Sequence, residues 1–443
     1  MASYFLALRQ IQFTLPALCC GLVFAQQPAE HPSINRGTVT ILSAYGGSAS
    51  HPVSLAEVSP GEFIGLTDAM RVFRMTSAGV VTVVRQIQAD GPYVGWAQGV
   101  NGRFYGAAAT REQAFNLSFD ANGDVRYYYD NTSPSGFSVA TAGGKLYGIA
   151  PAPGPNKSTF SAMNLAGALT SLYNFGTESP YILPILASDG NFYGLLELNY
   201  TASVYRVTPQ GDLKILVTYP DGVAGKWPPG SFSDTLIQAS NGKLYGTAAV
   251  GGANGAGALF EVSLAGSGYK VLKEFDHLST GAPNFLLEAD DGNIYGIAQG
   301  EPQLGPPSTL FRLTLDGKYE ALQHIGGSSE ACRCAMIQGS DGKLYGTAVN
   351  GAIWVWDLGL APPQPHITGL FPSSGAAGTT VVVTGKQLLG VTAVSFNGTP
   401  AASFSNIGGQ FVSATVPTGA TAGPVTLTNM NGTATSPAPF AVQ

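Results

Sequence analysis

A six-residue motif that closes on glycine recurs seven times through most of the chain. Its best copy is NGKLYG at residues 241–246. The other copies occupy residues 60–65, 101–106, 143–148, 189–194, 291–296 and 341–346, and the first of these, PGEFIG, is degenerate. The closing glycines are 41, 42, 46, 52, 50 and 50 residues apart. This period is typical of β-propellers, in which each repeat forms one four-stranded blade.

Each repeat divides into four expected strands. In the fifth copy an apolar run at 235–239 is followed by Asn-Gly, a pair that favours a tight hairpin turn, and then by the Leu-Tyr-Gly strand. Residues 258–262 and 270–275 supply the third and fourth strands. The central strands are apolar on both faces, as expected for a blade packed between two neighbours.

The two ends of the repeat array predict how it closes. The seventh copy has a third strand at 352–356 but then runs into Pro362-Pro363 without a fourth. A strand-like segment at 38–45 precedes the first copy and resembles an outer strand. Pairing it with the last blade would remove an exposed edge. The sequence therefore predicts an all-β chain with a seven-bladed propeller over 38–360, closed by an N-terminal strand.

The repeat also resembles a known family. DGKLYGTA followed by a Leu-Phe-x-Val strand is similar to the GloVer tandem repeats of bacterial surface and secreted proteins, sometimes described as choice-of-anchor repeats. The resemblance covers roughly residues 38–358 and is strongest from Leu236 onward. It implies a propeller and no particular activity.

A second module is expected after a proline-rich linker at 361–365. Residues 366–443 alternate apolar positions between turn signals, which indicates an immunoglobulin-like sandwich. The pattern over 365–443 resembles the IPT/TIG domain. That resemblance implies a spacer or adhesion module in a secreted protein.

Residues 1–25 have the features of a signal peptide, followed by a short lead at 26–37. Cys19 and Cys20 raise lipidation as an alternative, but Leu18 is bulkier than the residue expected before a lipidated cysteine. No membrane span is expected in the mature chain. Charged residues are 11% and the formal net charge is −6, without basic runs, so we expect no nucleic-acid partner. The predicted location is secreted, extracellular or on the outer cell surface.

The motif tyrosines and aspartates suggest two interpretations. A ring of tyrosines could stack on a ligand, but strand aromatics usually pack in the core, and we expect these to pack between blades. The members are Tyr105, Tyr147, Tyr193, Tyr245, Tyr295 and Tyr345. Turn chemistry explains Asp189, Asp291 and Asp341 better than acid–base catalysis does. The glycine after each tyrosine is expected to permit strand twist or a close backbone approach.

No catalytic or metal constellation is apparent, and no cofactor is expected. Cys332 and Cys334 could form a strained local disulfide or remain thiols. The histidines are isolated at positions 31, 51, 277, 324 and 366. His51 and His277 are of most interest, because both fall between expected blades.

Three aromatic residues in connections between blades are the predicted ligand-binding residues, namely Tyr93, Tyr181 and Trp227. On one rim they would suit stacking against sugar rings or anchoring a protein. They could equally pack under their own proline-rich loops. The long insertions at 250–258 and 300–308 could contribute to the same rim.

The leading hypothesis is a monomeric, non-catalytic recognition or adhesion protein that binds a polysaccharide or a surface protein through propeller loops. One alternative is an extracellular polysaccharide lyase or hydrolase with its site in the propeller channel. Another is a purely structural surface protein.

Overall fold

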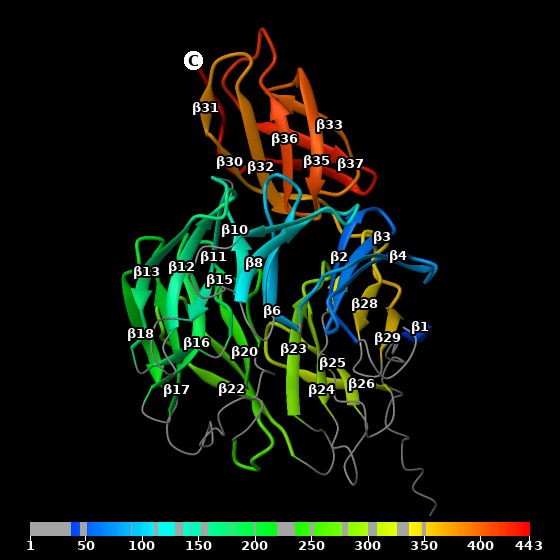
Figure 1. The fold of residues 1–443 in the computed structure, drawn as a ribbon, viewed down its shortest axis with the longest axis vertical. Coiled ribbons are helices and arrows are strands. Elements are labelled where there is room, and N and C mark those ends of the chain that lie inside the picture. The colour runs from blue at the N-terminus through cyan, green and yellow to red at the C-terminus, as the bar shows by residue number, and fades with distance from the viewer. Residues whose placement is uncertain are drawn as a thin grey trace, which may run out of the picture. The chain divides into compact units, whose positions relative to one another are not determined.

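The computed structural model describes residues 37–44, 51–89, 91–109, 114–128, 136–141, 143–151, 158–176, 178–180, 182–198, 201–218, 235–248, 252–276, 282–299, 308–325, 336–347 and 351–443. These residues form strands and turns, with no helix among them (Figure 1). Consequently no helix in this part of the chain could cross a bilayer. The expectation of an all-β chain is confirmed.

The first four repeats give sheets 1 to 4. Sheet 1 contains β2 (Pro52–Ser59), β3 (Glu62–Thr67), β4 (Arg71–Thr76) and β5 (Val81–Gln86). Sheet 2 contains β6 (Gly91–Gln98), β7 (Phe104–Ala109), β8 (Ala114–Phe119) and β9 (Val125–Tyr128). Sheet 3 contains β10 (Gly136–Ala140), β11 (Lys145–Pro151), β12 (Ser158–Asn164) and β13 (Leu169–Asn174). Sheet 4 contains β14 (Ser179–Pro180), β15 (Ile185–Leu186), β16 (Phe192–Leu198), β17 (Thr201–Val207) and β18 (Leu213–Thr218).

The last three repeats give sheets 5 to 7. Sheet 5 contains β19 (Leu236–Gln238), β20 (Leu244–Ala248), β21 (Ala258–Val262) and β22 (Lys270–Glu274). Sheet 6 contains β23 (Ala282–Glu288), β24 (Ile294–Gln299), β25 (Ser308–Leu313) and β26 (Tyr319–Ile325). Sheet 7 contains β27 (Met336–Gln338), β28 (Leu344–Thr347), β29 (Ala352–Asp357) and, in the outer place, β1 (Thr38–Ala44).

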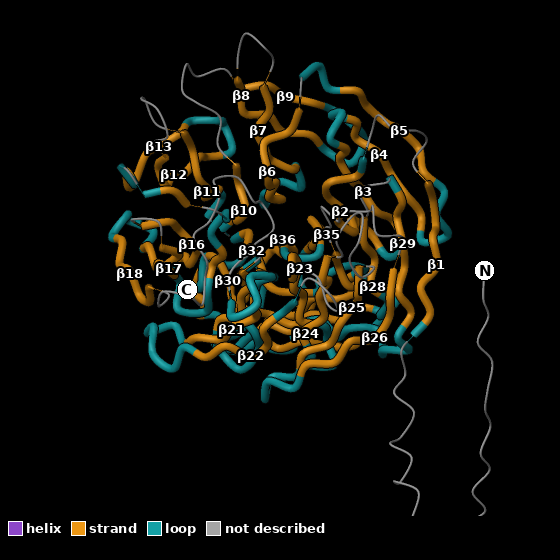
Figure 2. The backbone as a smooth tube through the Cα atoms, turned by 90° about the horizontal axis from the view of Figure 1, so that it is seen from below, coloured by secondary structure: helices purple, strands orange, loops and turns teal. Residues whose placement is uncertain are grey.

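The sheets are arranged around a common centre, with the first strand of each sheet inside and the last outside (Figure 2). The expected partner of the last repeat is present, because β1 pairs antiparallel with β29 from Thr38↔Asp357 onward. Sheet 1 then packs against sheet 7 through a cluster in which the rings of Phe63 and Tyr345 lie 4.5 Å apart. The N-terminal strand thus belongs to the same sheet as the C-terminal repeat.

Contacts between neighbouring sheets explain why the central strands are apolar on both faces. The cluster that contains Tyr245 and Leu259 of sheet 5 also contains Leu286 and Phe311 of sheet 6. A buried β-strand residue contributes roughly 1.5–3 kcal/mol through the removal of its side chain from water. Packing against the neighbouring sheets therefore contributes to the stability of each sheet.

The motif glycines make room for aromatic rings. Gly246 lies opposite Phe260 in the β20–β21 ladder, and a Cβ at residue 246 would overlap the Phe260 ring. Gly346 and Trp354 in sheet 7 are related in the same way. At these two positions the group that approaches the glycine is a cross-strand aromatic side chain, and not the backbone that was expected.

A second set of contacts, which we call junction hydrogen bonds, joins the turns of one sheet to the first strand of the next. Gln238 of sheet 5 accepts from Ser188 N of sheet 4 at 2.8 Å, and Glu288 of sheet 6 accepts from Ser240 N of sheet 5 at 2.8 Å. Gln338 accepts from Asp290 N at 2.9 Å in the same manner. These bonds fix the spacing of adjacent sheets near their inner strands.

The antiparallel order gives every sheet two different ends. Turns between first and second strands, and between third and fourth strands, lie at one end, which we call the turn end. The remaining connections lie at the other, the loop end. Turn-end connections such as 239–243 and 314–318 are short, whereas 219–235 and 326–335 at the loop end are long.

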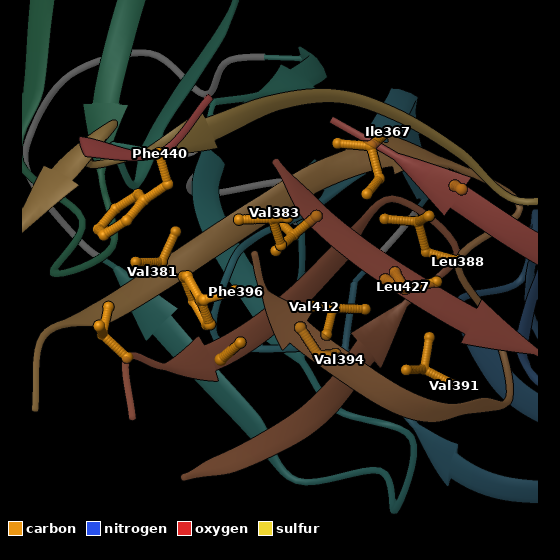
Figure 3. Packing of buried hydrophobic residues seen from close by; sticks show 14 residues of the cluster. Ile367, Val381, Val383, Leu388, Val391, Val394, Phe396, Val412, Leu427 and Phe440 are labelled. Atoms are coloured by element: carbon orange, nitrogen blue, oxygen red, sulfur yellow. The ribbon is translucent and has the colours of Figure 1, made fainter. Parts of the chain in front are cut away.

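The C-terminal module contains two four-stranded sheets and a short pair. One sheet has β30 (His366–Phe371), β32 (Thr380–Lys386), β35 (Ser403–Gly408) and β36 (Phe411–Thr415). The other has β33 (Val391–Phe396), β34 (Thr399–Pro400), β37 (Val425–Asn429) and β38 (Gly432–Thr435), and β31 (Ser374–Gly375) pairs with β39 (Ala441–Val442). Side chains from both sheets, including Val383, Val412, Phe396 and Leu427, form one apolar core (Figure 3).

Candidate functional site at the loop end

The polar groups of the repeat motif are used within the turn end. Asn241 Oδ1 accepts from Lys243 N at 3.1 Å, and Asn241 Nδ2 donates to the Tyr245 hydroxyl at 2.9 Å. That hydroxyl donates in turn to the Leu315 carbonyl of sheet 6 at 3.1 Å. Burial raises the pKa of Tyr245 to about 12, so the hydroxyl remains a donor at neutral pH. The motif residues therefore hold a turn and bind it to the next sheet.

Copies with aspartate in place of asparagine use the same positions. The hydroxyls of Tyr193, Tyr295 and Tyr345 donate to the carboxylate four residues earlier at 2.7, 2.8 and 2.8 Å. The six motif tyrosines are at most 5% exposed, so the expectation that they pack in the core is confirmed. The turn role of Asp189, Asp291 and Asp341 is confirmed as well, since each caps the N–H two residues later.

The predicted ligand-binding aromatics belong to loop-end segments of the sequence. Tyr93 is in β6, close to the end of that strand nearest the loop end, but its side chain lies outside the described residues. Tyr181, between β14 and β15, and Trp227, between β18 and β19, also lie outside them. Cys332, Cys334 and His277 do so too. Their roles stay predictions.

Among the described histidines, His324 and His366 have modest surroundings. His324 Nδ1 is 2.9 Å from Thr309 Oγ1, beside a hollow of about 450 Å³ on the outer strands of sheet 6. His366 is exposed at the start of β30. Among the described residues, neither histidine forms an ion pair with a carboxylate.

His51 and Asp68 form the most specific polar arrangement that the structure describes at the loop end. His51 immediately precedes β2, and Asp68 immediately follows β3, so the pairing of the two inner strands brings them together. Asp68 Oδ1 accepts from the His51 backbone N–H at 2.7 Å, and Asp68 Oδ2 is 2.7 Å from His51 Nδ1. Asp68 N donates back to the His51 carbonyl at 2.8 Å.

This geometry keeps Asp68 ionised. Burial favours the neutral acid, but the hydrogen bonds from the backbone and the ring of His51 outweigh it and lower the pKa of the Asp68 carboxyl. The side chains of the pair are 29% and 35% exposed, so solvent reaches both. A carboxylate-held imidazole of this kind can accept or transfer a proton, or accept a hydrogen bond, at its other nitrogen.

The pair lacks some of the surroundings that enzymes usually supply. Within the described ranges, no group of three or more His, Cys, Asp or Glu side chains is placed to hold a metal ion. Within this part of the chain, neither His51 nor Asp68 forms a hydrogen bond or ion pair with a serine, a cysteine or a second carboxylate. Sequence reasoning singled out His51 by its position but missed Asp68, because strand pairing rather than local spacing joins residues 17 apart.

Comparisons with known proteins place the repeats in a family and the sheets in a fold. A family model described as the Gloeobacter/Verrucomicrobia repeat matches residues 133–354. Virginiamycin B lyase from Staphylococcus aureus superposes with a TM-score of 0.50 at 13% identity, over 72% of this chain and 99% of that one. The WD40 β-propeller domain of Doa1 superposes with a TM-score of 0.50 at 10% identity, over 72% and 97%.

These structural likenesses, at identities this low, bear on the fold. They confirm a propeller-type arrangement of antiparallel sheets, and the family match confirms the predicted kind of repeat. A comparison with curated proteins gave no significant match.

Proposed function

The chain belongs to the Gloeobacter/Verrucomicrobia repeat family, and on that premise we propose that it is a non-catalytic recognition protein, secreted or held at the cell surface. Its ligand is a polysaccharide or a surface protein, bound at the loop end. The propeller has seven blades over 38–360, a linker at 361–365 and an immunoglobulin-like module of IPT/TIG type at 366–443. Export depends on the signal peptide at 1–25, and the mature protein is a monomer.

The observation that carries this proposal is the difference between the two ends of the sheets. At the turn end, asparagine, aspartate and tyrosine side chains are hydrogen-bonded within the chain, as in Asn241–Tyr245–Leu315. Connections at the loop end range from 68–70 to 219–235, although the strands that they join are alike. Rigid scaffolds usually carry binding residues on such variable connections.

The proposal is tested by binding and by turnover in one assay. Purified mature protein is titrated into laminarin, xylan, dextran and polygalacturonate, and into extracts of cell-surface protein, with binding followed by calorimetry. Chromatography of the same mixtures after prolonged incubation detects shortened or unsaturated sugars. Binding without products supports the proposal, and binding to none of these probes contradicts it.

Variants of the three predicted aromatics locate the ligand. Tyr93→Ala, Tyr181→Ala and Trp227→Ala should each weaken binding if they stack on the ligand, because loss of a contact aromatic commonly costs 1 kcal/mol or more. Phe404→Ala, which changes an exposed aromatic residue on β35 of the C-terminal module, is the matched control. An equal loss of affinity in Phe404→Ala would show that the ligand does not bind specifically at the loop end.

The His51–Asp68 pair favours one second candidate function, an extracellular polysaccharide lyase or hydrolase. An imidazole oriented by a carboxylate can serve as a general base. Glycoside hydrolysis normally requires two carboxyl groups about 5–10 Å apart. Among the described residues, Asp68 supplies the carboxyl group that contacts His51. Accumulation of products in the incubation above, and its loss in His51→Phe, would favour this alternative.

A further inference from the structure

The Asp68 carboxylate makes two separate contacts with His51. Asp68 binds the backbone N–H of His51 with one oxygen and the imidazole with the other, each at 2.7 Å. The main-chain bond fixes His51 where the chain enters β2, and the ring bond fixes its side chain. His51 is therefore held in place before any ligand arrives, which reduces the entropy lost on binding.

The same contacts determine which nitrogen carries the proton. An ionised carboxylate has lone pairs and no hydrogen to donate. The lowered pKa of Asp68 keeps it in that form. His51 Nδ1 must therefore be the protonated nitrogen, and in the neutral imidazole Nε2 has the free lone pair.

That lone pair has no partner among the residues that the structure describes. The hydrogen bond from the His51 ring in this part of the chain goes to Asp68 through Nδ1. With 29% of its side chain exposed, His51 can reach a molecule from solvent. The group that fits Nε2 is a hydrogen-bond donor.

We propose that His51 Nε2 accepts a hydrogen bond from a hydroxyl group of a neutral saccharide bound at the loop end. This inference rests on the proposed function and restricts its ligand to a neutral saccharide. A hydroxyl supplies the donor that Nε2 requires. The carboxylate of a uronate or a phosphate group offers lone pairs and no donor, and its charge would be repelled by the Asp68 carboxylate and by a chain of formal net charge −6.

A single substitution reverses the polarity of Nε2 and preserves the geometry. In Asp68→Asn the amide oxygen still accepts from the His51 N–H, and the amide nitrogen donates to Nδ1. The ring proton then moves to Nε2, which becomes a donor. His51→Phe removes both nitrogens, and His324→Phe is the matched control, because His324 also contacts its neighbour through Nδ1.

The experiment measures the affinity of the full chain and its three variants for laminarin, xylan, dextran and polygalacturonate by calorimetry. Long-range proton–nitrogen spectra of the imidazoles report the tautomer in the same samples, and thermal melting reports folding. We expect at least one neutral glycan to bind more tightly than polygalacturonate. Asp68→Asn and His51→Phe should weaken that binding roughly five- to thirty-fold, as for a lost hydrogen bond that leaves a group unsatisfied, and His324→Phe should not.

The outcomes separate this inference from the proposed function. If the glycan binds all four proteins equally, or if polygalacturonate binds best, the inference is overturned and the recognition function stands. If the spectra place the proton on Nε2 of His51 in the unmodified chain, the inference is overturned whatever the affinities. If none of the probes of the previous assay binds, both proposals are overturned.

Discussion

Glu57 of sheet 1 accepts hydrogen bonds from the backbone N–H and the hydroxyl of Ser340 in sheet 7, each at 2.7 Å. The two residues are 283 positions apart, yet their relationship repeats that of Gln238 with Ser188 in neighbouring sheets. The contact between the first and last repeats is thus an ordinary junction hydrogen bond. It joins the beginning of the repeat array to its end.

Glu57→Ala should destabilise the chain by about 1–3 kcal/mol, because it leaves Ser340 N and Gly61 N without their acceptor. Glu57→Gln is the matched control, since glutamine already makes this contact at Gln238 and Gln338. Urea unfolding followed by tryptophan fluorescence measures both. Equal loss in the two variants would show that the charge rather than the acceptor is required.

The same carboxyl predicts a dependence of stability on pH. Burial raises the pKa of Glu57 above its usual 4.5, the hydrogen bonds from Gly61 and Ser340 oppose this, and the charge of Asp341 adds to it. A raised pKa means that the folded chain binds the proton more tightly, so this contribution is fully present below pH 4.5 and is lost as pH rises through the folded pKa. As pH rises from 4.5 through the folded pKa of Glu57, the unfolding midpoint of Glu57→Gln should therefore rise relative to that of the unmodified protein. A constant difference between them would contradict the assignment.

Tyr245→Phe should cost about 1 kcal/mol, because it removes the hydroxyl that joins Asn241 to the Leu315 carbonyl. Tyr147→Phe is the control, since the Tyr147 hydroxyl forms no hydrogen bond with the described residues although its side chain is also buried. Thermal unfolding of both variants gives the comparison. A loss of the same size in each would assign the effect to ring packing.

Gly246→Ala should destabilise sheet 5 by about 1–3 kcal/mol, as overpacking does, because the new methyl group would overlap the Phe260 ring. Phe260→Leu should be destabilising in the unmodified chain but should relieve part of the effect of Gly246→Ala. A double-mutant cycle measures this coupling. Additive losses would mean that the glycine is required for its backbone rather than for the ring.

Local patterns in the sequence predicted the strands well. The third strand expected at 258–262 agrees with β21, and the strand expected at 352–356 agrees with β29 apart from one residue. The Asn-Gly and Asp-Gly turns and the buried tyrosines follow from short-range spacing within the motif. The pairing of β1 with β29 follows from the missing fourth strand of the last repeat. Such features can be read from a repeat without knowing how its copies pack.

Contacts between copies were harder to foresee. The acceptors of the junction hydrogen bonds lie at equivalent positions of consecutive repeats, namely Gln238, Glu288 and Gln338. Each accepts from a backbone N–H about 50 residues earlier in the chain. The His51–Asp68 pair depends on where β2 begins and β3 ends, which no motif marks. Both depend on the three-dimensional path of the chain more than on residue type.

The place of β1 has a consequence for biosynthesis. As the polypeptide leaves the ribosome, Thr38–Ala44 is made first among the strands of sheet 7, and its partner Ala352–Asp357 is made last. The six intervening sheets can form in order, but the earliest strand must wait for more than three hundred residues of translation. Until the final repeat appears, the partner of β1 is therefore missing, and the unpaired strand is exposed to association with other chains throughout that interval.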